Sequence, residues 1–331
     1  MLPVLTAADD PTLRPWHLSV DGMSPEGPNL SHWPGNRTPA DLKADLSTGI
    51  CLRFARASEA ARAALLAGAT QVLNDHYDTD GFLSLLAVTR PEVALAREEV
   101  CLAAAATGDY GIFVTPRAFA IDRIVLNLGK RPGTPLYGQL EGSLPQRNHR
   151  RYLWLLDHAD EVLDRPEALA PLYADELSAV LTALDAARTG ALRRSLFHAE
   201  GLSVLESDTP VPRMVLNTLA FLHRVLHVQA AGSQGRLYRL HERTESWFDM
   251  VTISPPARRD LRPIAARLQD LEGGLTTVGA ARWNADAPTE PIPELYYGVP
   301  AAQAYGEVTR ALAPSRLPPA RVIEELRAYF R

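Results

Sequence analysis

Cysteine is nearly missing from this chain, because its 331 residues include only Cys51 and Cys101. Two cysteines without metal-binding spacing cannot form a disulfide framework, so a reducing compartment fits best. The chain also lacks a run of about 18 apolar residues, the length that a transmembrane helix needs. Its first residues show no basic segment followed by an apolar one, which a secretory signal would have. We therefore expect a cytoplasmic protein that does not enter a membrane.

An excess of positive charge is missing as well. The formal net charge is −5 and the pI is about 6.0, which argues against an extended nucleic-acid-binding surface. Hydrophobic residues make up 46% of the chain and charged residues 22%, which is enough apolar material for a sizeable core. The length suggests two domains or one large one.

Three well-known catalytic or nucleotide-binding signatures are absent from the sequence. There is no Gly-x-Ser-x-Gly elbow, which disfavours an α/β-hydrolase. Gly129-Lys130 is followed by Arg131 and lacks the upstream glycine, so it is not a phosphate-binding Walker A loop. No Gly-x-Gly-x-x-Gly pattern occurs, which disfavours a Rossmann dehydrogenase.

The pattern of apolar and turn-forming residues predicts an α/β protein. We expect an N-terminal α/β domain with a mainly parallel sheet over residues 1–195, followed by an α+β C-terminal part over residues 196–331. In the N-terminal part, the expected strands are 16–20 and 69–74. Helices are expected to begin at Thr38-Pro39-Ala40-Asp41 and to cover residues 57–68, 82–88 and 92–107.

The remaining elements are expected as follows. Residues 150–189 should be helical, with breaks at Pro166 and Pro171. A strand is expected at 200–206, and residues 236–241 and 246–251 could pair as a hairpin. Helices at 260–272 and 319–330 complete the prediction.

One segment has the composition of a metal site. His76, Asp78 and Asp80 occupy alternate positions after a predicted strand, and Gly81 follows them directly. Residues two apart point the same way in extended chain, so these three side chains can converge on one cation. The carboxyl end of a parallel strand is also where α/β sheets bind ligands. Two carboxylates and an imidazole suit Mn²⁺, Zn²⁺ or Fe²⁺ better than Ca²⁺.

Two other interpretations of this segment have to be weighed. An EF-hand loop counted from His76 would place Ala87 at its twelfth position, where that motif needs glutamate. That interpretation therefore fails. Asp78 and Asp80 could instead simply cap the next helix, which is what an isolated Asp-x-Asp usually does. The preceding histidine, the following glycine and the strand in front favour the metal site.

The residues from Val72 to Ser84 resemble the first motif of the DHH phosphoesterase superfamily, in which an apolar strand is followed by His or Asp, x, Asp, x, Asp, Gly, x, x, Ser. The resemblance implies a two-metal hydrolase that prefers Mn²⁺, with Mg²⁺, Zn²⁺ or Fe²⁺ as alternatives. It also implies a small phosphorylated molecule or a short oligonucleotide as substrate. The chain as a whole resembles an uncharacterised bacterial family, through its His-Trp-Pro-Gly-Asn-x-Thr-Pro run and its Ser-Trp-Phe segment.

The superfamily's Asp-His-His motif normally follows the first motif, but here its counterpart, Ser31-His32-Trp33-Pro34-Gly35, precedes it. The motif order is therefore permuted and one histidine is lost. Asp157-His158 lies downstream within a charged helix and is interpreted as coincidence. The glycine-rich, histidine-containing motif of the superfamily's second domain is absent, and Gly273-Gly274 is a weak echo of it.

Further residues are predicted to complete the site. We assign His32, Asp78, Asp80 and Asp109 to catalysis, and His76, Asp78, Asp80, Asp109, His32, Asp21 and Asp45 to the metal ions. Asp21 follows a predicted strand and could equally form a turn, whereas Asp45 could be a helix-surface charge. His223 and His227 are spaced i, i+4, and without an accompanying glutamate we interpret them as a helix-face pair that binds no metal.

Arginines of the C-terminal half are predicted to bind the anionic group of the substrate, because a guanidinium can donate two parallel hydrogen bonds to phosphate. The candidates lie at predicted strand ends and loops: Arg243, Arg258, Arg259 and Arg282, with Trp283 placed to stack on a ring. Each alone could equally be a solvated surface arginine.

These observations together predict a metal-dependent hydrolase of phosphate esters or phosphodiesters. The alternatives are a non-catalytic nucleotide- or metal-binding protein that keeps the fold, and an enzyme of different chemistry that uses the same metal site. The sequence leaves a homodimer open and does not name the substrate.

Overall fold

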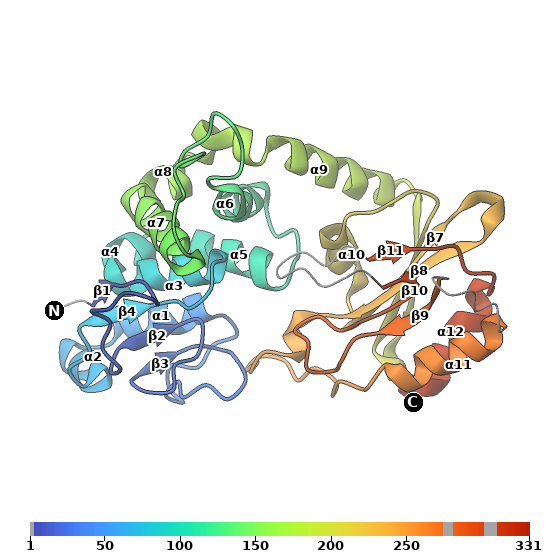
Figure 1. Cartoon of the computed structure of the whole chain (residues 1–331), viewed down its shortest axis with the longest axis horizontal. Coiled ribbons are helices and arrows are strands. Elements are labelled where there is room, and N and C mark those ends of the chain that lie inside the picture. The colour runs from blue at the N-terminus through green and yellow to red at the C-terminus, as the bar shows by residue number, and fades with distance from the viewer. Residues whose placement is uncertain (1–2, 274–280, 301–309) are drawn as a thin grey trace. The chain divides into compact units, whose positions relative to one another are not determined.

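The computed structural model describes residues 3–273, 281–300 and 310–331 (Figure 1). Its contacts divide the chain into two compact units. Unit 1 comprises Met1–Ala179 and Phe248–Ser254, and unit 2 comprises Val180–Trp247 and Pro255–Arg331. A seven-residue segment from late in the sequence thus belongs to the N-terminal unit. The predicted α/β class is confirmed, with a parallel sheet in unit 1 and a mixed sheet with helices in unit 2.

The sheet of unit 1 is short and entirely parallel. Its strand order is β1 (Val4–Leu5), β4 (Gln71–Leu73), β2 (Leu18–Val20) and β3 (Asn29–Leu30). The predicted strands at 16–20 and 69–74 correspond to β2 and β4. Because all four strands run the same way, their carboxyl ends meet at one edge of the sheet.

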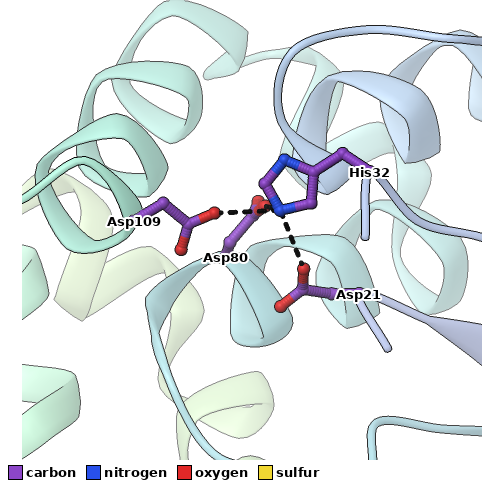
Figure 2. A group of neighbouring side chains, drawn as sticks. All are labelled: Asp21, His32, Asp80 and Asp109. Atoms are coloured by element: carbon purple, nitrogen blue, oxygen red, sulfur yellow. Dashed lines mark ion pairs between the residues drawn. The ribbon is translucent and has the colours of Figure 1, made fainter. Parts of the chain in front are cut away.

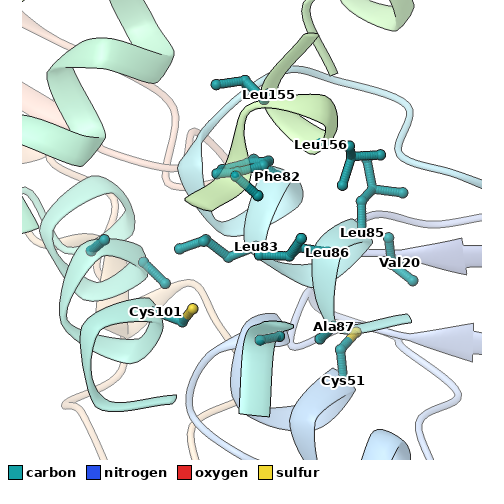
Figure 3. Close-up of a cluster of buried hydrophobic side chains, with 14 of the residues drawn as sticks. Val20, Cys51, Phe82, Leu83, Leu85, Leu86, Ala87, Cys101, Leu155 and Leu156 are labelled. Atoms are coloured by element: carbon teal, nitrogen blue, oxygen red, sulfur yellow. The ribbon is translucent and has the colours of Figure 1, made fainter. Parts of the chain in front are cut away.

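Helix α3 (Thr79–Thr89) begins at that edge and forms the centre of the hydrophobic core. Its side chains from Phe82 to Val88 are buried on every side, so this helix is apolar all round rather than amphipathic. Figure 3 shows Phe82, Leu83, Leu85 and Leu86 packed among Val20, Leu155 and Leu156. Cys51 and Cys101 are both free thiols buried in this core, as expected for a chain without a disulfide framework.

Further helices cover the sheet and α3. They are α1 (Ser47–Arg56), α2 (Glu59–Leu66), α4 (Pro91–Leu95), α5 (Glu98–Asp109), α6 (Pro116–Asn127), α7 (Leu144–Asp157), α8 (Ala159–Asp164) and a 3₁₀ segment (Pro166–Leu172). Helix α9 (Ala174–Arg188) begins in unit 1 and continues into unit 2. Residues 150–189 are mostly helical, as predicted, and the expected break occurs just before Pro166. Pro171 lies inside the 3₁₀ segment, and the interruption at His158 was not predicted. The helix predicted over 92–107 is interrupted between α4 and α5, and α6 was not predicted at all.

The helix predicted to begin at Thr38 is wrong. Residues 39–46 form turns, and the helix begins only at Ser47. The Thr38 hydroxyl does not cap a helix. It accepts a hydrogen bond from the Ser31 amide at 2.8 Å and donates one to the Ser31 carbonyl at 2.7 Å. Thr38 therefore closes the loop that follows β3.

Unit 2 is built on a mixed sheet of order β11 (Ala311–Leu312), β10 (Glu294–Val299), β8 (Arg236–Glu242), β7 (Arg224–Ala230), β6 (Leu202–Ser207) and β5 (Leu192–Phe197), with β9 (Arg282–Ala285) also paired to β10. Only β6 and β7 run parallel among these described pairs. Helices α11 (Arg262–Glu272) and α12 (Pro319–Phe330) pack on one face, and α10 (Arg213–Ala220) packs on residues of the other. The predictions of helices at 260–272 and 319–330 are confirmed.

Two predictions for this half are wrong. Residues 246–251 form no strand, and β8 pairs instead with β7 and β10. His227 lies on β7, not on a helix, because α10 ends at Ala220 and the next residue, Phe221, has a φ of 61°. The run Val225-Leu226-His227-Val228 that follows suits a strand. No helix in the described ranges is long and apolar enough to cross a membrane.

Candidate metal centre

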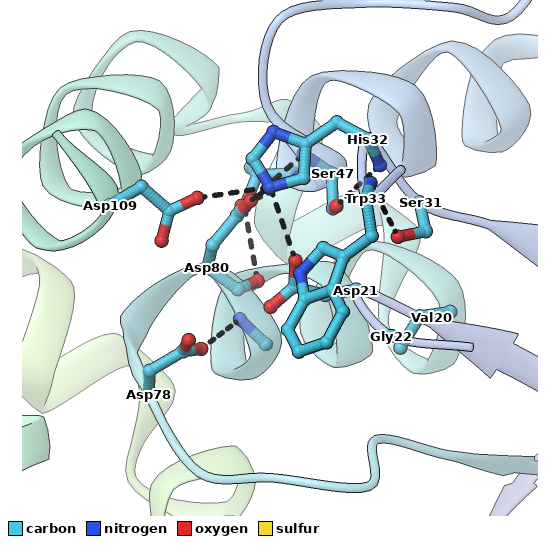
Figure 4. A network of polar contacts seen from close by, with 12 residues as sticks. Val20, Asp21, Gly22, Ser31, His32, Trp33, Ser47, Asp78, Asp80 and Asp109 are labelled. Carbon is cyan, nitrogen blue, oxygen red and sulfur yellow. Dashed lines mark hydrogen bonds and ion pairs between the residues drawn. The ribbon is translucent and has the colours of Figure 1, made fainter. Parts of the chain in front are cut away.

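Polar side chains follow three neighbouring strands of the parallel sheet at the points where those strands end. Asp21 comes directly after β2, His32 follows β3, and residues 74–78 connect β4 to α3 (Figure 4). The strands are parallel, so these side chains lie at the same edge. Asp109 reaches the edge from the last residue of α5.

Four of these side chains form a first group of potential metal ligands. Donor atoms of Asp21, His32, Asp80 and Asp109 all lie within 4.8 Å of one another. His32 Nε2 is 3.6 Å from Asp21 Oδ1, 3.7 Å from Asp80 Oδ2 and 3.2 Å from Asp109 Oδ2 (Figure 2). The side chains of His32 and Asp80 are completely buried. Three carboxylates and one imidazole thus converge in a space shielded from water.

The tautomer of His32 follows from its other ring nitrogen. Nδ1 lies 2.7 Å from the carbonyl oxygen of Asp45, which can only accept, so Nδ1 carries a proton. In the neutral imidazole, Nε2 then presents its lone pair to three carboxylate oxygens. Histidines that bind metal commonly donate their other ring N–H to a backbone carbonyl in this way, which fixes the orientation of the ring.

Asp80 is oriented by the start of another helix. Its Oδ2 accepts the Ser47 amide at 2.8 Å and its Oδ1 accepts the Thr48 amide at 2.7 Å. These are first-turn amides of α1, whose own N-cap residue, Leu46, cannot bond them. Asp80, which lies 33 residues after Ser47 in the sequence, therefore caps the N-terminus of α1. Its Oδ2 also faces His32 Nε2.

A second group consists of Asp21, His76 and Asp78. His76 Nε2 is 2.8 Å from Asp78 Oδ2 and 3.3 Å from Asp21 Oδ2, and its Nδ1 is 2.9 Å from Asp75 Oδ1. Asp78 is also the N-cap of α3, since its Oδ1 accepts the Gly81 amide. The side chains of His76 and Asp78 are 28% and 31% exposed, so this group is open to water whereas the first is not.

The three side chains expected to converge on one cation are thus divided between two groups. The chain does not stay extended after His76. It turns into α3 at Asp78, so Asp80 points to the first group and not to the group of His76 and Asp78. Gly81 lets Asn74 and Tyr152 pack closely against the start of α3, since a Cβ there would lie 2.5 Å from Asn74 Nδ2 and 2.7 Å from the Tyr152 hydroxyl.

Asp21 belongs to both groups. Its Oδ1 faces His32 and its Oδ2 faces His76, so one carboxylate offers one oxygen to each side. Its backbone has a φ of 47°, in the left-handed region that aspartate tolerates better than most residues. Such backbone strain persists only where the surroundings hold it, and it is concentrated at functional sites.

The charge of the cluster shifts the pKa values of its members. Burial, followed by the charges of Asp78 and Asp80, raises the pKa of Asp21 well above its usual range. Burial and the same two neighbours, Asp80 first, likewise raise the pKa of Asp109. For His76, burial opposes protonation, but the Asp78 charge and the hydrogen bonds that His76 donates to Asp21, Asp75 and Asp78 outweigh it and raise its pKa. The carboxylates therefore favour any cation, proton or metal, that enters.

The carboxylate of Asp45, predicted as a ligand, is not in either group. Its Oδ1 accepts the backbone amides of Val251 and Thr252 at 2.7 and 2.9 Å, and its Oδ2 accepts the Thr252 hydroxyl. Its carbonyl oxygen accepts from His32 Nδ1 and from the Tyr110 hydroxyl. Asp45 thus holds the His32 ring in place through its backbone carbonyl.

Residues 248–254, which we call the strap, pack against the first group. Phe248 stacks on the His32 ring, with centroids 3.8 Å apart and an interplanar angle of 18°. The Asp249 amide donates to the His32 carbonyl at 2.7 Å, and the Asp249 carboxylate pairs with Lys43. No local sequence signal predicted these contacts. The one related observation in the sequence is that the Ser-Trp-Phe segment and the His-Trp-Pro-Gly run together carry the resemblance to an uncharacterised family.

Phe248→Ala should weaken metal binding about tenfold, because outer contacts that orient a histidine ligand typically contribute that much. The measurement is calorimetric titration of the metal-free protein with Mn²⁺. Phe221→Ala removes an exposed phenylalanine of unit 2 and is the matched control. Equal Mn²⁺ affinity in the two variants would show that the strap does not support His32.

The comparisons with known proteins place the chain in a family. A family model described as a family of unknown function, DUF6687, matches residues 5–331. The chain belongs to this family. No curated protein and no solved structure matches it. The expected resemblance to an uncharacterised family is confirmed, whereas these comparisons add nothing to the resemblance to DHH phosphoesterases.

The four predicted substrate arginines of this DUF6687 member lie in unit 2 and contact other parts of it. Arg243 pairs with Glu245, and Arg258 donates to Ser246 and to the Pro291 carbonyl. Arg259 donates to the Tyr329 carbonyl. Arg282 bonds Asn284 at 3.1 Å and lines a cavity of about 570 Å³. Trp283 is 5% exposed and packs in the core near Tyr238, so its ring is not presented for stacking.

Proposed function

We propose that unit 1 binds two divalent metal ions and hydrolyses phosphate esters or phosphodiesters. The observation that supports this is the position of Asp21 between two ligand groups, with one carboxylate oxygen directed to each. Paired ions in hydrolases lie about 3.5–4 Å apart and share such a carboxylate. The motif resemblance of His76, Asp78, Asp80 and Gly81 to DHH phosphoesterases supports the same chemistry.

The two ligand groups would each hold one metal ion. His32, Asp80 and Asp109 would hold one ion in the buried group, and His76 and Asp78 would hold the other on the exposed side. Mixed carboxylate and imidazole donors suit Mn²⁺, with Mg²⁺, Zn²⁺ and Fe²⁺ as alternatives. When bound, such a pair lowers the pKa of a water molecule and offsets the charge of a phosphoryl group.

The substrate would approach the exposed group. His76 and Asp78 are each about 30% exposed, whereas His32 and Asp80 are buried. The Trp33 ring lies 4.9 Å from the His76 ring and forms an apolar wall beside it. A small phosphorylated molecule or the end of a short oligonucleotide fits this placement, and the net charge of −5 disfavours a long nucleic acid.

The test combines metal content with activity. The 331-residue chain should bind about two equivalents of Mn²⁺ and cleave at least one of p-nitrophenyl phosphate, bis-p-nitrophenyl phosphate and a dinucleotide in a Mn²⁺-dependent manner. Asp80→Asn should lose metal and activity, whereas Asp157→Asn, which changes an aspartate that is 68% exposed, should keep both. Two bound ions without cleavage of any substrate would favour a non-catalytic metal-binding protein. Absence of tight metal binding would refute the proposal.

A further inference from the structure

A buried carboxylate in unit 2 is surrounded by more arginines than it needs. Glu294, at the start of β10, is completely buried. Arg239 binds it through two nitrogens, at 3.0 Å from Nε to Oε2 and 2.8 Å from Nη2 to Oε1. Arg310 Nη1 adds a contact of 2.7 Å to Oε2, and Arg213 Nη2 pairs with Oε1. Three guanidinium groups therefore meet at one carboxylate.

The charges of this group do not balance. Arg310 also pairs with Asp286, so the cluster contains three guanidinium groups and two carboxylates. A single bidentate arginine would have neutralised Glu294. Burying an unmatched charge is costly unless a counter-ion is near. Among the residues that the structure describes, the cluster thus has one more guanidinium group than carboxylates.

Two neutral histidines lie beside the arginines. His227 and His241 alternate with core residues on β7 and β8, so they share the sheet face of Arg239. Burial, then the Arg239 charge, lowers the pKa of His227 to about 4. Burial, then the charges of Arg213 and Arg239, also lowers the pKa of His241 well below its usual value. Burial is the larger cause in both cases, and the arginine charges add to it.

The arginines are within reach of a solute. The side chains of Arg213 and Arg239 are 33% and 32% exposed, although their ends contact a carboxylate that is not exposed at all. Arg239 uses Nε and Nη2 for Glu294, and within the described residues its Nη1 has no hydrogen-bond partner. Arg213 lies in the first turn of α10, so the amides at the start of that helix add to the positive field.

We propose that Arg213, Arg239 and Arg310 form a binding site for the phosphate group of a small molecule. Phosphate has the charge that the cluster lacks and the oxygen geometry that guanidinium groups bind best. Glu294 holds the three side chains together when the site is empty. The site lies wholly in unit 2 and does not depend on the metal ions proposed for unit 1.

The experiment uses the 331-residue chain in EDTA, so that a phosphate ion cannot be held by metal. Calorimetric titration with inorganic phosphate should show binding to the parent protein. Arg239→Gln should weaken that binding at least tenfold. Arg193→Gln, which changes an exposed arginine on β5 of the same sheet, should leave it unchanged. A parent that does not bind phosphate, or an Arg239→Gln variant that binds like the parent, would overturn the proposal.

A second variant covers the case in which Arg239→Gln fails to fold. Glu294→Gln removes the internal competitor for the arginines and should tighten phosphate binding several-fold. An unchanged or weaker affinity would mean that the cluster is only a structural ion-pair network. Metal is absent throughout this experiment, so a negative result does not count against the proposed hydrolase activity of unit 1. Conversely, failure of the hydrolase test does not count against the phosphate site of unit 2.

Discussion

Replacing Asp21 with asparagine is expected to reduce Mn²⁺ binding from two ions to at most one and to lower phosphoesterase activity by about 10³-fold or more. An amide cannot bridge two cations with two anionic oxygens. Losing several kcal/mol of charge stabilisation at the reacting group corresponds to this factor, at about 1.36 kcal/mol per tenfold change in rate. Metal analysis of the purified variant and steady-state kinetics on the best substrate give the two numbers.

Asp21→Asn should stabilise the metal-free protein, although it weakens metal binding. The pKa of Asp21 is raised chiefly by burial and by Asp78 and Asp80, so its charge destabilises the metal-free folded state at neutral pH. Asp21→Asn should therefore raise the melting temperature in EDTA while lowering it in Mn²⁺. Asp175→Asn, an exposed change on α9, is the control and should alter neither. A variant that still binds two ions would remove the bridging role of Asp21.

Removal of the metal ions should reverse the pH dependence of stability. In EDTA, Asp21, Asp109 and His76 all have raised pKa values, so the folded state holds more protons than the unfolded chain. Their stabilising effect is complete at low pH and is lost as pH rises through the folded values. Each extra proton contributes a slope of about 1.4 kcal/mol per pH unit. The window begins near the usual carboxyl value of 3.8 and extends above the usual histidine value of 6.5.

With Mn²⁺ the slope should have the other sign, because protons compete with metal for the same atoms. At a metal concentration 100 times the dissociation constant, binding adds about 2.7 kcal/mol. Asp78 does not affect the pH dependence of stability between pH 5 and 8. Its pKa is lowered, so its contribution to stability changes only near and below pH 3.8. Calorimetric melting between pH 5 and 8, with EDTA or Mn²⁺, gives the two slopes. Parallel slopes in the two series would mean that these residues hold no metal.

The sequence predicted those parts of the fold that depend on neighbouring residues. The strand before the His76 loop, the central helix after it and the terminal helix 319–330 follow from local periodicity and were found. The helix predicted at Thr38 was wrong because its start is decided elsewhere. Asp80 caps α1 at Ser47 and Thr48, and no rule based on adjacent residues could anticipate that. The strand at Arg224–Ala230 was missed because the i, i+4 spacing of two histidines resembled a helix.

The candidate site shows the same limit. Asp78 and Asp80 were recognised from their spacing, but the assignment of each to a different group depends on where the chain turns into α3. His32 and Asp109 were named from a motif resemblance and a lone aspartate after a helix, and the fold brings them together. Phe248 could not be foreseen, because it stacks on a residue more than 200 positions earlier. Such contacts arise from tertiary packing, which a single sequence does not encode in any short pattern.

The late position of the strap has a consequence for biosynthesis. A ribosome that has made Met1–Ala179 has produced both ligand groups, yet Phe248–Ser254 is still missing from the nascent chain. During that interval the His32 ring has no Phe248 stacked on it, and the Asp45 carboxylate has not received the Val251 and Thr252 amides. Unit 1 is therefore finished only after much of unit 2 has been translated. Metal loading of the complete centre would thus follow synthesis of the strap.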